Sequence, residues 1–94
     1  MVAGCRSSGV LTADKLVVTG QAKLISIHAA EVGGAGAPAL IKVYDSTSAS
    51  GKEIARMAIG GEQTLEFDMH GVLCTNGIFF EEVSGAVAVS IEFS

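Results

Sequence analysis

The sequence predicts an all-β fold, either an antiparallel β-sandwich or a jelly-roll-like barrel of about seven or eight short strands. Apolar residues alternate with small or polar residues in several runs, and turn residues separate these runs. The chain also holds twelve glycines against a single proline, which indicates many tight turns. Alternation with a period of two places apolar side chains on one face of a strand, as in a half-buried sheet.

The clearest run is at the C-terminus. There Val87, Val89, Ile91 and Phe93 alternate with Ala86, Ala88, Ser90, Glu92 and Ser94. The same period appears over residues 64–68 and 40–44. These three runs predict strands with one buried face.

The remaining elements follow in chain order. Residues 9–12 and 15–19 predict one or two short strands, and residues 21–31 a strand in which neither face is strongly polar. The glycine-rich segment 33–38 predicts a long, mobile hairpin loop, because Gly carries a high backbone entropy cost and Pro38 lacks an N–H.

Residues 50–53 match a helix capping box, but the segment after them is short and lies between strands, so 52–59 is interpreted as a strand rather than a short helix. Asn76-Gly77 predicts a β-hairpin, and Ser84-Gly85 the next turn. Residues 69–71 are interpreted as a turn between strands, with Asp68 bonding nearby backbone amides. We expect residues 1–8 to be a flexible N-terminal tail and 9–94 a single domain.

Composition limits the possible functions. A net charge of −4, with only six scattered basic residues, argues against nucleic-acid binding, which needs clustered Lys and Arg. No apolar run approaches the length of a membrane span, so no membrane partner is expected. Charged residues make up 17% of the chain and hydrophobic residues 49%, so the chain has few charged side chains with which to cover the surface of a monomer. Cys5 and Cys74 are interpreted as separate free thiols.

Chemical motifs are weak. Asp68, His70 and Cys74 are of metal-binding types, but three mixed ligands without a paired Cys-x-x-Cys do not define a site. The glycine-rich run at 34–39 resembles a dinucleotide-binding fingerprint, but a strand pattern follows it where that motif requires a phosphate-binding helix. His28 and His70 have no framing catalytic motif, and the adjacent Glu81 and Glu82 point to opposite faces of a strand. We therefore expect no enzyme activity, cofactor or metal.

A face of small residues is the most informative feature. It occupies positions where a monomer normally carries Lys, Glu and Thr, and it allows another sheet or subunit to approach closely. Leu24, Ser26, His28, Ala30, Ala86, Ala88 and Ser90 form it. Burial between subunits is preferred here, and cover by a second sheet of the same chain is the alternative.

The segments 42–55, 65–68, 76–79 and 85–89 resemble small β-sandwich virion proteins of tailed phages. The resemblance implies a capsid decoration (cement) protein or a related head or tail accessory protein. Such a protein would bridge and stabilise neighbouring capsid subunits without chemistry. The implied partners are copies of the chain, with a trimer favoured, and the major capsid protein or another virion protein. The implied location is the virion, after synthesis in the host cytoplasm.

A receptor- or glycan-binding module of a phage fibre or tail is the alternative function. In that case the loops at 33–38 and 46–51 would make the contacts. Sugar sites usually stack rings on aromatic side chains, and this chain has no Trp and a single tyrosine, Tyr44.

Overall fold

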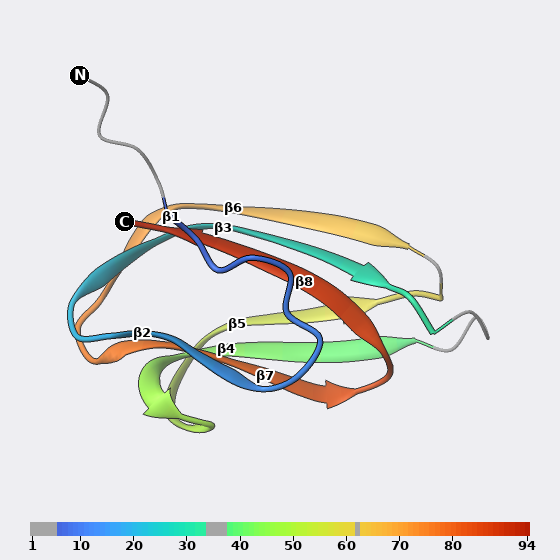
Figure 1. Ribbon diagram of the computed structural model, residues 1–94, viewed down its shortest axis with the longest axis horizontal. Helices are drawn as coiled ribbons and strands as arrows, with labels where there is room; N and C mark the ends of the chain where they lie inside the picture. Colours follow the sequence, from blue (N-terminus) through green and yellow to red (C-terminus); the bar gives the residue numbers. More distant parts are fainter. Residues whose placement is uncertain (1–5, 34–37, 62) are drawn as a thin grey trace.

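The computed structural model describes residues 6–33, 38–61 and 63–94. Within these residues, eight strands form two antiparallel four-stranded sheets that pack face to face (Figure 1). The strands are β1 (Arg6–Ser7), β2 (Lys15–Thr19), β3 (Ala22–Glu31), β4 (Ala39–Ser48), β5 (Ser50–Ile59), β6 (Thr64–Cys74), β7 (Gly77–Ser84) and β8 (Val87–Phe93). The predicted all-β sandwich is confirmed, although several strands are longer than expected.

The strand order is that of a jelly roll. The first sheet runs β1-β8-β3-β6 and the second β2-β7-β4-β5. Consecutive strands therefore alternate between the sheets, and β4–β5 is the exception within the described chain, a true hairpin in the second sheet. Two interleaved Greek keys of this kind define a double-sheet jelly roll. No described helix has the length and apolar character that a membrane crossing requires.

The core fills the space between the sheets with apolar side chains. Alternate residues of the central strands point inward, which is the arrangement that the period-two runs predicted. The largest fully buried side chains are Phe80, Leu24, Ile27, Ile41, Met57, Ile59, Ile78 and Ile91. Each such side chain contributes about 1.5–3 kcal/mol relative to an exposed one.

Residues 52–59 belong to β5, so the strand interpretation is confirmed over the capping-box alternative. A strand buries Ala55, Met57 and Ile59 at alternate positions on one face, whereas a helix would have presented a different set. The burial of these three side chains against the other sheet outweighs the local helix signal.

Two predicted turns differ from the structure. Asn76 precedes β7, but β6 and β7 lie in different sheets, so the turn links the two layers and is not a hairpin. Residues 69–71 lie inside β6, at the shift between the pairs Leu24↔Val72 and Ser26↔Asp68. His70 has φ 55° and Gly71 φ 80°, so the residues that suggested a turn form a bulge instead. The Asp68 carboxylate accepts the His70 N–H at 3.0 Å, as predicted.

The first described residues lie along β8. Arg6 pairs with Phe93, the Ser8 N–H donates to the Ile91 carbonyl at 2.8 Å, and Leu11 forms a two-way bridge with Val89. Residues 6–8 of the predicted tail are therefore bonded to the sheet, while residues 1–5 are outside the described residues. The hairpin predicted at 33–38 is wrong, because β3 and β4 lie in different sheets, and residues 34–37 of this connection are outside the described part.

Asp45 holds the connection between β6 and β7. Its carboxylate, 7% exposed, accepts the N–H of Asn76 at 2.8 Å and the N–H of Thr75 at 3.1 Å. The Asn76 hydrogen bond, with contributions of the same sign from Thr75 and Gly77, outweighs burial and lowers the pKa of Asp45. This buried acid ties the end of β4 to a turn about thirty residues further along the chain.

Candidate functional site

The outer face of the first sheet is built from three strands in register. His28 of β3 lies between Glu66 of β6 and Ser90 of β8, because the pairs His28↔Glu66 and His28↔Ser90 fix their positions. The next rows are Thr64, Ala30 and Ala88 on one side, and Asp68, Ser26 and Glu92 on the other. Side chains directly opposite on one face are close enough to interact. We call these nine residues the outer face.

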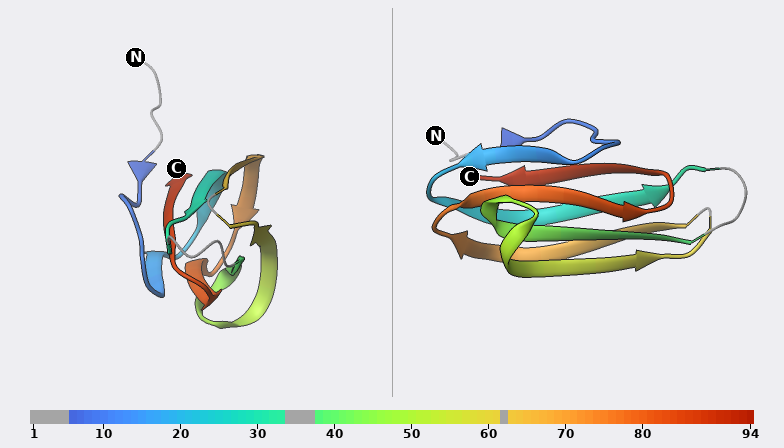
Figure 2. Two further views of the ribbon diagram at one scale, coloured as in Figure 1. Left: turned by 90° about the vertical axis from the view of Figure 1, so that its right-hand side faces the viewer. Right: turned by 90° about the horizontal axis from the view of Figure 1, so that it is seen from below.

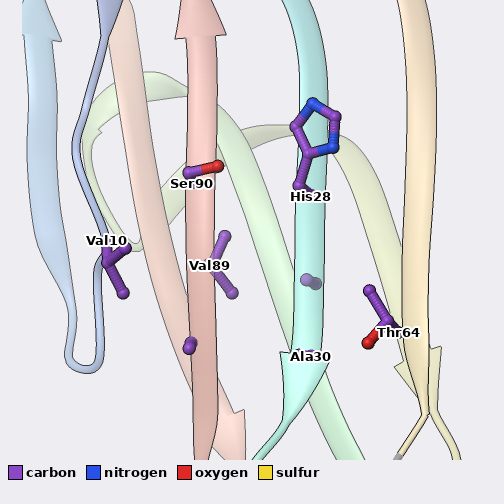
Figure 3. Close-up of a pocket in the computed structure, with 8 residues that line it drawn as sticks. Val10, His28, Ala30, Thr64, Val89 and Ser90 are labelled. Carbon is purple, nitrogen blue, oxygen red and sulfur yellow. The ribbon is translucent and has the colours of Figure 1, made fainter.

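One end of the outer face is small and apolar and forms a shallow hollow of about 140 Å³. Val10, His28, Ala30, Thr64, Ala88 and Ser90 line it (Figure 3). Val10, from the segment before β2, closes one side and is itself 72% exposed. The hollow is an open depression rather than an enclosed cavity, and its lining is mostly apolar, so it offers a contact surface to an apolar side chain of a partner.

The other end of the outer face is polar. The Glu92 Oε1 atom lies 2.7 Å from the His28 Nε2 atom and accepts the Ser26 hydroxyl at 2.8 Å. The Glu66 Oε2 atom lies 3.8 Å from the His28 Nδ1 atom, so the imidazole sits between two carboxylates. The Ser26 Oγ atom also lies 3.3 Å from the His28 Nε2 atom, so Ser26, His28 and Glu92 form one hydrogen-bonded cluster at this end of the outer face.

Most of the predicted interface residues do share this face. Ser26, His28, Ala88 and Ser90 all lie on it and are half-buried, and the second sheet packs on the opposite side of the first. Ala86 lies just outside it, in the turn before β8, where its carbonyl accepts the Val32 N–H at 2.9 Å.

Leu24 is in the core, at 0% exposure, and not on the outer face where the alternation placed it. The register shifts between Leu24 and Ser26 on both sides of β3. This bulge inserts Ile25, so that Leu24 and Ile27 both point inward although they are an odd number of residues apart.

The interface prediction did not include five residues of the site: Thr64, Glu66, Asp68 and Glu92 of the outer face, and Val10 of the hollow. Glu92 continues the alternation of Ala88 and Ser90, so the period-two pattern contained a signal for it. Thr64, Glu66 and Val10 come from other segments, and sheet order alone brings them beside β3 and β8.

The weak metal candidates are not brought together. Cys74 is buried in the core, and burial raises the pKa of its thiol. Asp68 and His70 are exposed at the bulge, where the Asp68 Oδ1 and His70 Nδ1 atoms are 3.6 Å apart. Among the described residues, no three His, Cys, Asp or Glu side chains form a metal-binding group.

No family model, curated protein or solved structure matches this chain. The chain is a jelly-roll β-sandwich with an apolar core, and one sheet face has a small apolar end and a polar end.

Proposed function

We propose that this chain is a non-enzymatic virion structural protein, a capsid decoration protein that forms closed homo-oligomers and bridges neighbouring capsid subunits. One observation carries the proposal: the outer face places Ala30, Ala88 and Ser90 side by side, around a hollow that can accept a side chain of another subunit. The row of Thr64, Ala30 and Ala88 at the hollow end of the outer face contains no charged side chain, so covering that end costs little side-chain entropy and little charge hydration.

The architecture also supports the proposal, by analogy. Double-sheet jelly rolls build viral capsid domains, and they also build lectins and cupins, so the fold is compatible with the role without implying it. In this chain the space between the sheets is filled by apolar side chains. A close-packed interior has low compressibility, which suits a protein that reinforces a shell better than one that binds a ligand between its sheets.

The glycan-binding alternative has less support. Tyr44 is largely buried, and its hydroxyl donates to the Glu81 Oε1 atom at 2.7 Å. A sugar ring would need an exposed aromatic face on which to stack. The loop at 33–38, one of its two candidate contact regions, is only partly within the described residues.

Light scattering after size exclusion tests the assembly. We expect a closed trimer or larger ring for the chain itself, and association at least tenfold weaker for Ala88→Glu, which places a carboxylate in the hollow. Ala49→Glu adds the same charge at an exposed position in the turn between β4 and β5 of the second sheet and should assemble normally. Equal masses for all three proteins would refute the proposed interface.

A second experiment tests the virion role. Antibodies raised against the purified chain should label virions of the phage that encodes it, at regular positions on the head, in immunogold electron microscopy. Particles that lack the chain altogether would rule out a decoration protein, even if the chain forms a closed oligomer in solution.

A further inference from the structure

The edge strands on the two sides of the sandwich differ in length. On one side lie β1 and β2, of two and five residues, joined by a segment that bonds to β8 through Ser8 and Leu11. On the other side lie β5 and β6, of ten and eleven residues, one above the other and running in opposite directions (Figure 2). Long edge strands carry rows of unpaired N–H and C=O groups, which proteins normally shorten, bend or cover.

Both long edges include a regular stretch. In β5, residues 55–59 pair without interruption with β4, and in β6, residues 64–68 pair without interruption with β3. The bulges lie outside these stretches, at Val43/Tyr44 and Leu24/Ser26. Each edge therefore presents about a whole strand length of regular backbone to a further strand.

The inward residues of these stretches are apolar and incompletely covered. Phe67 pairs with Ile27, a fully buried residue, so its side chain is on the core-facing side of β6, yet Phe67 is 37% exposed. Leu65, on the same face of β6, is only partly buried against the core. The sandwich is thus open between its two long edges, with a phenylalanine at the opening.

Charge decides which strand can cover these edges. β6 carries Glu66 and Asp68 on its outward face and contains no Lys or Arg. Antiparallel pairing of two β6 strands about Phe67 would place Glu66 opposite Asp68, and like charges directly opposite are destabilising. β5 instead presents Arg56 on its outward face, where its side chain is 58% exposed although the guanidinium also donates to the Glu53 carboxylate at 2.8 and 3.0 Å.

We propose that two copies of this chain dimerise through these edges, with β6 of each copy pairing with β5 of the other. In antiparallel register, Met57 then lies opposite Phe67 of the second copy and Ile59 opposite its Leu65, which closes the apolar opening. The same register places Arg56 opposite Asp68, with Glu66 as its diagonal neighbour.

A twofold axis parallel to the strands satisfies both pairings at once. Rotation about that axis exchanges the layers, so β6 of one copy meets β5 of the other in the first layer, and the reverse pair forms in the second layer. Because β5 and β6 run in opposite directions, both new pairs are antiparallel. The interface is isologous, and the result is two continuous eight-stranded sheets.

This contact does not use the hollow of the outer face, although Glu66 and Asp68 belong to both surfaces, so it can be tested separately from the proposed function. The two contacts are separated experimentally by working in the Ala88→Glu background, in which assembly through the outer face is blocked. In that background we expect a dimer by sedimentation velocity.

Charge exchange provides the decisive test. Arg56→Glu alone, and Glu66→Lys with Asp68→Lys, should each weaken the homodimer at least tenfold, because both edge contacts become repulsive. Mixed in equal amounts, the two variants should form a heterodimer, because each edge again joins a cation to an anion. Lys15→Glu reverses a charge on the opposite side of the sandwich and should leave the dimer unchanged.

A chain that stays monomeric in the Ala88→Glu background would overturn the proposal. So would a dimer that Arg56→Glu leaves intact, or a mixture of the two charge variants that fails to associate while circular dichroism shows both folded.

Discussion

Replacing Asp45 with asparagine tests how strongly one buried carboxylate stabilises this fold. The side chain keeps its size but loses its charge, and its amide offers one acceptor where the carboxylate offers two, one to Asn76 and one to Thr75. Hydrogen bonds to charged groups contribute about 1.5–3 kcal/mol, and an unpaired buried N–H costs about 1–3 kcal/mol. We expect Asp45→Asn to lower the free energy of unfolding by about 2–3 kcal/mol, from which a Tm decrease of roughly 10–20 °C follows for a domain this small.

The effect should depend on pH in a defined direction. The pKa of Asp45 is lowered in the folded state, so its stabilisation is complete above the ordinary Asp pKa of 3.8 and is lost as pH falls through the lower folded-state pKa. Urea unfolding at a series of pH values should show the difference between wild type and Asp45→Asn shrinking below about pH 4.

Asp68→Asn is the matched control, since Asp68 accepts a single backbone N–H and is exposed. It should cost less than about 1 kcal/mol. Equal losses for the two variants, or a difference between wild type and Asp45→Asn that does not change with pH, would show that Asp45 does not hold the β6–β7 connection.

Three further predictions follow from particular contacts. Gly77→Ala should destabilise the fold more than Gly20→Ala. Both glycines have positive φ, but a Cβ at Gly77 would lie 2.6 Å from the Val18 carbonyl oxygen, whereas a Cβ at Gly20 would meet open space. Equal midpoints in chemical denaturation would contradict this. Leu24→Ala should cost about 2–4 kcal/mol and Ser26→Ala much less, as measured by thermal unfolding, and the reverse order would place Leu24 outside the core. Tyr44 should ionise above its ordinary pKa of 10.0, because its hydrogen bond to Glu81 raises that pKa, and Glu81→Gln should lower the pKa again. Tyr44 is the single tyrosine of the chain, so absorbance titration follows it alone. A titration midpoint that Glu81→Gln leaves unchanged would exclude this hydrogen bond as the cause.

The fold class was predictable because strand alternation is a local property. The run from Val87 to Phe93 shows it most clearly, and every one of its inward residues is buried. Which strands pair was not predictable, because sheet order depends on contacts between distant segments. Asn76-Gly77 illustrates the difference, since its residues correctly indicated a turn but contained no information on whether the next strand joins the same sheet.

The site was predictable in part for the same reason. Ser26, His28, Ala88 and Ser90 share a face by alternation and register, whereas the bulge at Ile25 moved Leu24 into the core. Bulges insert a residue without a distinctive local sequence, so strict alternation fails on one side of them. His70 and Gly71 form the bulge in β6 that lies opposite the one in β3. Their residue types correctly indicated irregular backbone, but the irregularity is a bulge and not a turn.

The position of β8 makes the first sheet depend on a distant part of the chain. β8 is the last of the eight described strands in sequence order, yet it lies inside the first sheet, between β1 and β3. Without β8, β1 has no partner strand and β3 is paired on one side only. Removal of residues 87–93 should therefore prevent folding of the domain rather than shorten it.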